Sequence, residues 1–157
     1  MGYLTPKQRL VWSLKSEGYT EAGIGRKLDI TRQTVHKALG VANKKILQAL
    51  EETAKINRIE IQTVSPTQGY LTGYSLHFNT EAFVTYSPTN GVQIWYEHEG
   101  NCKKCKKAKE CRDALLVEAK ERKIDFGKDV DRMLPSKLAK TLFSKIKGKK
   151  GNDKAHP

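Results

Sequence analysis

The sequence predicts an α+β fold, with an N-terminal helical domain, a small antiparallel sheet and C-terminal helices. Apolar residues recur at helical spacing in residues 5–56 and again in 108–146, whereas they alternate with polar residues between 59 and 96. The net charge of +12 is also unevenly distributed along the chain. Residues 1–58 have 11 basic and 5 acidic side chains (+6), 59–101 have none and 4 (−4), and 102–157 have 18 and 8 (+10). We therefore predict domains at 1–58 and 59–147, followed by a disordered basic tail at 148–157.

Composition excludes several classes of protein. Uncharged apolar stretches are only a few residues long, so we expect neither a membrane span nor a secretory signal. Three cysteines within ten positions make a poor disulfide framework and a better metal site in a reducing compartment, which predicts a cytoplasmic protein. No phosphate-binding glycine loop, nucleophile–base pair or paired-carboxylate motif is recognisable. We therefore expect no enzymatic activity.

Three short helices are predicted in the first 40 residues, each beginning at a threonine. Thr5, Thr20 and Thr31 can each accept a hydrogen bond from a backbone amide in the first helical turn. Gly18 is a helix stop after the first helix. The apolar side chains expected to pack between the helices are Leu10, Val11, Leu14, Ile24, Leu28, Ile30, Val35 and Ala38, with Gly25 where the backbones approach. Two helices that meet across a tight turn in this way are typical of a helix-turn-helix.

The segments Leu4–Gln8, Glu17–Glu21 and Ile24–Val35 resemble the helix-turn-helix of the LuxR-type and sigma-factor region-four superfamily. Archaeal Tfx-type regulators open in a similar way. The resemblance covers residues 3–58, and the chain departs from the family at Gly25, where the family usually has alanine, and at Asp29, where it often has glycine. It implies binding to double-stranded DNA, with the third helix entering the major groove.

The third helix is predicted to expose polar side chains suited to a DNA groove once Val35 and Ala38 turn inward. Gln33 can pair with adenine and Arg32 with guanine, while the threonines can contact phosphates. An ordinary solvated helix face is the alternative. The predicted DNA-binding residues are Thr31, Arg32, Gln33, Thr34, His36 and Lys37.

A heptad pattern continues from the third helix to residue 57. Its apolar positions are Val35, Leu39, Ala42, Ile46, Ala49, Thr53 and Ile56, and Gly40 is a point at which the helix could divide. A DNA-binding head joined to such a helix suits a homodimer on a palindromic site. The alternative is that this edge packs within the chain against the first helix.

The acidic middle segment is predicted to form an antiparallel meander. Period-two alternation appears at 59–64, 70–78, 82–86 and 92–96, and Gly, Pro and Asn residues fall at the joins. The aromatic side chains of these strands could hold a small ligand or a partner, but they are more often simply core.

The sequence from residue 98 to 111 reads H-x3-C-x2-C-x5-C and predicts a metal knuckle. Three thiolates and an imidazole complete a tetrahedron, and no evident group supplies a general base beside an open coordination position, so the predicted site is structural. Zinc is the first choice; an iron–sulfur cluster and unligated thiols are the alternatives. The predicted ligands are His98, Cys102, Cys105 and Cys111.

Two amphipathic helices are predicted after the cysteines, one beginning near residue 108 and one at 136–146. Together, these features predict a sequence-specific DNA-binding transcription regulator. Two other classes stay open: an iron–sulfur redox-sensing regulator, and an adaptor that binds a protein partner of the transcription machinery.

Overall fold

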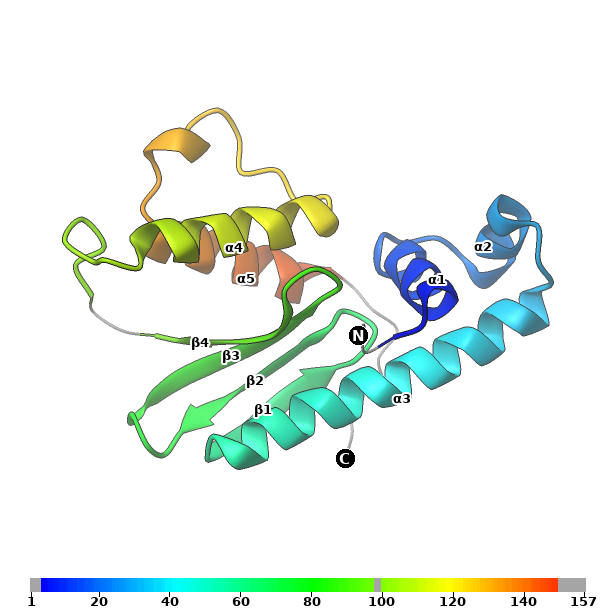
Figure 1. Ribbon diagram of the computed structural model, residues 1–157, viewed down its shortest axis with the longest axis horizontal. Coiled ribbons are helices and arrows are strands. Elements are labelled where there is room, and N and C mark those ends of the chain that lie inside the picture. The colour runs from blue at the N-terminus through cyan, green and yellow to red at the C-terminus, as the bar shows by residue number, and fades with distance from the viewer. Residues whose placement is uncertain (1–3, 98–99, 150–157) are drawn as a thin grey trace.

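The computed structural model describes residues 4–97 and 100–149 and has an α+β fold in three layers (Figure 1). The long helix α3 covers one face of a four-stranded sheet, and α4 and α5 lie over the other face. The described elements are α1 (Pro6–Ser16), α2 (Glu21–Leu28), α3 (Arg32–Ile56), β1 (Ile59–Ser65), β2 (Tyr70–Ser75), β3 (Thr80–Ser87), β4 (Gly91–Tyr96), α4 (Ala108–Glu121) and α5 (Pro135–Gly148), with a 3-10 turn at Val130–Arg132.

The three N-terminal helices begin as their threonine caps predict. Thr5 accepts from the amide of Gln8 (3.2 Å), and the Gln8 side chain accepts from the amide of Thr5 (3.1 Å), which completes a capping box. Thr20 and Thr31 cap α2 and α3 through their side-chain oxygens. One prediction about the packing is wrong: Leu10 is 49% exposed, and the inward stripe of α1 is Val11, Trp12 and Leu14.

The predicted antiparallel meander is confirmed, with strand order β1-β2-β3-β4. The second strand ends at Ser75 rather than at 78. Leu76 and Phe78 lie in the following turn and are 43% and 57% exposed, so the apolar alternation there reflects surface residues and not a longer strand.

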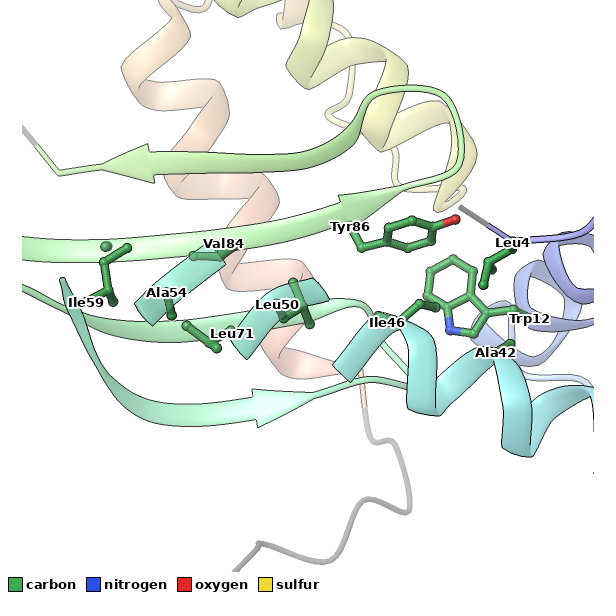
Figure 2. Packing of buried hydrophobic residues seen from close by; sticks show 11 residues of the cluster. Leu4, Trp12, Ala42, Ile46, Leu50, Ala54, Ile59, Leu71, Val84 and Tyr86 are labelled. Carbon is green, nitrogen blue, oxygen red and sulfur yellow. The ribbon is translucent and has the colours of Figure 1, made fainter. Parts of the chain in front are cut away.

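The C-terminal part of α3, from Ala42 to Ala54, shares one hydrophobic core with the sheet and α1 (Figure 2). Ile46, Leu50 and Ala54 point from α3 toward the strands, while Trp12 of α1 lies edge-on to Tyr86 of β3 with 5.2 Å between ring centroids. The indole Nε1 of Trp12 also donates to the carbonyl of Pro66 (3.0 Å). The N-terminal helices are therefore anchored to the sheet, because one core crosses the predicted boundary at residue 58.

The heptad pattern of α3 is buried within this chain over its first half only. Val35, Leu39, Ala42 and Ile46 are buried, but the stripe then continues through Leu50 and Ala54, whereas Ile56 is 80% exposed. The helix changes its apolar spacing because its first half packs on α1 and α2 and its second half on the sheet. The helix runs unbroken through Gly40.

A buried ion pair holds α4 against the sheet. Glu118 is fully buried and accepts from Arg122 (3.1 Å) and from Thr85 of β3 (3.0 Å). Arg122 also donates to the carbonyls of Gln68, Gly69 and Tyr86. Burial raises the pKa of the Glu118 carboxyl, and the guanidinium of Arg122 beside it opposes that rise.

The C-terminal helices also match their prediction. Leu138, Leu142 and Ile146 of α5 are buried with Leu115 and Ala119 of α4 in a second core. The predicted tail begins too early: Gly148 ends α5, and Lys149 donates from Nζ to the Arg122 carbonyl (2.7 Å). Residues 150–157 of that tail lie outside the described residues. No helix in the described ranges has the length and apolar character needed to cross a membrane.

Candidate nucleic-acid interface and cysteine loop

The turn between α2 and α3 is held by close backbone contact. Asp29 adopts the left-handed conformation (φ 54°) and ends α2, and the amide of Ile30 donates to the Gly25 carbonyl (2.9 Å). A Cβ atom at Gly25 would lie 2.8 Å from the Ile30 carbonyl oxygen, so glycine is what allows this approach. The two departures from the family pattern, at 25 and 29, therefore both lie at this turn.

A small apolar core fixes α3 relative to α1 and α2. Ile24 and Val35 are fully buried, and Val11, Leu14 and Leu39 complete the cluster. Leu28, Ile30 and Ala38 pack on it while half-buried. Apart from Leu10, every side chain that the sequence places in this core is found there. The polar face of α3 is left outward as a consequence.

The six predicted DNA-binding residues lie together at the start of α3. Arg32, Gln33, His36 and Lys37 are exposed, Thr31 is exposed at the cap, and Thr34 is half-buried. These turns of α3 lie with α2 at one end of the molecule, and the loop before α4 lies at the other end (Figure 1). The exposure of Arg32, Gln33 and Lys37 shows that this face of α3 is open to solvent.

Thr31 and Thr34 form hydrogen bonds at the start of α3. The Thr31 oxygen accepts from the amide of Thr34 (3.1 Å), and the two hydroxyls are 2.8 Å apart. The Thr31 hydroxyl is therefore engaged at the helix cap. Arg32, Gln33 and Lys37 carry further donors and acceptors on this face.

Sequence reasoning missed a carboxylate that lies against the predicted interface. Glu21, the first residue of α2, is within 3.1 Å of His36 Nδ1. The two residues are 15 positions apart, and they meet only because the α2–α3 turn brings the helix starts together. Glu21 orients the imidazole and places one negative charge beside a positive surface.

Two further basic side chains lie beside the turn. Arg26 and Lys27 are exposed in the last turn of α2, and Lys27 Nζ lies 5.4 Å from the ring centroid of Tyr19. Basic residues at a helix C-terminus are favoured by the helix dipole, so their position alone gave no functional signal. They extend the positive charge of α3 across the turn.

The cysteine loop lies between β4 and α4. A turn is formed as the Cys105 amide approaches the Cys102 carbonyl (3.4 Å), and Cys111 lies in the first turn of α4. Cys102 and Cys111 are half-buried and Cys105 is exposed. The predicted fourth ligand, His98, lies outside the described residues.

The surroundings of Cys111 disfavour its thiolate form. Burial raises the pKa of the Cys111 thiol, and the neighbouring thiols of Cys105 and Cys102 raise it further. Such repulsion is what a bound cation relieves, and sulfur ligands in this spacing suit zinc chemically. Among residues 4–97 and 100–149, however, no group of three His, Cys, Asp or Glu side chains is arranged to hold a metal ion.

Comparison with known proteins gives no match to a family model, to a curated protein or to a solved structure. A functional proposal for this protein therefore rests on its own sequence and structure.

Proposed function

We propose that this chain is a sequence-specific, double-stranded DNA-binding transcription regulator whose reading element is the start of α3. One observation carries the proposal: the α2–α3 turn and its small core present Arg32, Gln33 and Lys37 on one open helix face. A helix of this kind fits the major groove, where arginine reads guanine and glutamine reads adenine. The resemblance of residues 3–58 to the LuxR-type helix-turn-helix supports the same function.

Removing the proposed base-reading side chains lowers DNA affinity. A preferred duplex is first selected from a random-sequence library. Arg32→Ala and Gln33→Ala then each weaken binding to that duplex by about 1–3 kcal/mol, because each removes a bidentate contact to a base. Fluorescence anisotropy titrations at two salt concentrations measure the loss, since specific contacts persist when phosphate attraction is screened.

Lys55→Ala is the matched control for charge. Lys55 is exposed near the far end of α3, about 35 Å along the helix from Arg32. Its loss leaves discrimination between selected and random duplexes unchanged. The proposal fails if the library yields no preferred sequence, or if both reading-face variants discriminate as well as the unaltered protein does.

We infer that the protein binds its site as a homodimer, because the reading end of one α3 helix contacts few base pairs and twofold sites double that number. The heptad edge is an unsuitable interface over its first half, whose apolar side chains are buried inside this chain. Sedimentation equilibrium with and without the selected duplex measures the stoichiometry.

The cysteine loop is proposed to hold one structural zinc ion through Cys102, Cys105, Cys111 and His98. When bound, zinc would fix the loop by neutralising the thiolates; the chain's own part is to supply four ligands within 14 positions. Protein purified without oxygen is expected to be colourless, with about one zinc per chain. Cys105→Ser and His98→Asn each reduce the zinc content to less than half.

Metal analysis and the visible absorption spectrum check this result. His77→Asn is the matched histidine control, because His77 is exposed in the turn between β2 and β3. A brown, iron-containing protein contradicts zinc and supports the iron–sulfur redox regulator instead.

A protein-interaction adaptor is the second candidate, favoured by the exposed apolar side chains Ile56, Leu76 and Phe78. The Leu76 amide donates to the Arg58 carbonyl (3.0 Å), which brings the β2–β3 turn beside the end of α3. For an adaptor, DNA binding would lose all sequence preference at the higher salt concentration.

A further inference from the structure

A large cavity lies between α5 and the sheet face that α4 and α5 cover. Its volume is about 950 Å³, which is within the range of small-molecule sites. It extends from the cysteine loop, where all three cysteines are lining residues, across the strands to Gln62 of β1. The site is separate from the proposed DNA-binding face, which lies at the other end of the molecule (Figure 1).

Aromatic rings form the apolar part of this cavity. Phe143 of α5 stacks on Phe83 of β3 with 4.2 Å between centroids, and Trp95 of β4 lies 5.9 Å from Phe143. All three residues line the cavity, and Trp95 and Phe143 are only half-buried. Flat ring surfaces that the protein leaves partly uncovered suit a flat apolar ligand, because stacking and area burial both favour it.

Charge around the cavity is divided between its two sides. Lys140 and Lys147 line it from α5, two helical turns apart, and Lys147 Nζ lies 5.5 Å from the Phe83 ring centroid. Glu81 and Glu97 line the opposite rim at one corner of the sheet, where the Glu97 amide donates to the Glu81 carbonyl (2.9 Å).

The wider field favours an anion on the lysine side. Residues 102–149, which supply the cysteine loop, α4 and α5, carry 16 basic and 7 acidic side chains. That excess raises the local concentration of anionic ligands. The two glutamates are confined to one corner and leave the α5 wall positive.

We propose that this cavity binds a small, flat, mostly apolar molecule with one anionic group, such as an aromatic carboxylate or sulfonate. Its ring system would lie against Trp95 and Phe143, and its anion would face Lys140 and Lys147. This site does not depend on the proposed DNA-binding function.

Two matched fluorescent probes test the class of ligand. Anilinonaphthalene sulfonate is aromatic and anionic, and phenylnaphthylamine is its uncharged analogue. The full-length protein is expected to bind the sulfonate saturably at one site per chain and more tightly than the amine. Lys140→Gln combined with Lys147→Gln weakens sulfonate binding about threefold to tenfold, as expected for charge contacts from two exposed lysines, and leaves amine binding unchanged.

A substitution that fills the cavity is the second test. Ser144 lines the cavity from an exposed position on α5, so Ser144→Trp should block the probe without disturbing the core. Lys137→Trp adds the same ring to an α5 position that is exposed and outside the cavity lining, and it keeps full binding. Circular dichroism and the urea unfolding midpoint show that both variants are folded.

Three results overturn the proposal. The first is probe binding that does not saturate or that survives Ser144→Trp. The second is equal affinity for the anionic and uncharged probes together with no effect of the lysine substitutions. The third is a protein that is dimeric until Ser144→Trp makes it monomeric, because a second copy would then cover the cavity.

Discussion

Replacing Arg122 with methionine is expected to lower the free energy of unfolding by about 3–5 kcal/mol. The substitution leaves Glu118, which is fully buried, without its guanidinium partner, and it removes the donors to the carbonyls of Gln68 and Tyr86. A buried charge without a partner costs more than the pair contributes, so the loss exceeds that of a surface ion pair. Urea unfolding followed by circular dichroism measures it.

Two companion variants separate charge from shape at this ion pair. Glu118→Gln removes the charge but keeps one carbonyl oxygen that can accept from Arg122, while its amide nitrogen can donate to the Thr85 hydroxyl, so its loss should be the smaller one. Glu118→Leu together with Arg122→Met removes both charges and should recover part of the stability lost in Arg122→Met alone. An Arg122→Met protein within 1 kcal/mol of the unaltered one would contradict this account.

Trp12→Ala is expected to cost about 3–5 kcal/mol, the usual range for deleting a buried tryptophan. Trp12 is 2% exposed, and its ring lies among α1, α3 and Tyr86 of β3. The cavity left behind would separate the N-terminal helices from the sheet. Thermal and urea unfolding, with the near-ultraviolet circular dichroism of the aromatic side chains, check the effect.

Trp12→Phe tests the hydrogen bond apart from the ring. It retains most of the buried area but leaves the Pro66 carbonyl without the indole donor, and we expect a loss of about 1–2 kcal/mol. Equal losses for alanine and phenylalanine would show that packing of the ring contributes little.

Local signals predicted much of this fold. Threonine caps at 5, 20 and 31 and the alternation of the middle segment are short-range patterns, and the structure confirms both. Long-range packing was harder to predict. Leu10 fits an apolar stripe yet faces solvent, and α3 changes from one buried spacing to another after Ile46 because its packing partners change along its length.

For the candidate site, too, the sequence predicted some features and not others. The exposure of Arg32, Gln33 and Lys37 follows from the helical period once Val35 is known to be buried. The Glu21–His36 contact and the cavity under α5 depend on how separate elements meet, so no local pattern indicates them. Whether the four proposed ligands hold zinc stays a prediction.

The continuity of α3 limits how the proposed reading face can adapt to DNA. One rod of 25 residues, about 38 Å long, carries the proposed groove-reading end and is also built into the sheet core at its other end. In the proposed dimer, two such rods would hold their reading ends at a separation set by the rest of each subunit. If the spacer between the two half-sites of the DNA were one base pair longer, one half-site would be rotated by about a tenth of a helical turn relative to the other. The unbroken helix has no hinge that would let its reading end follow this rotation.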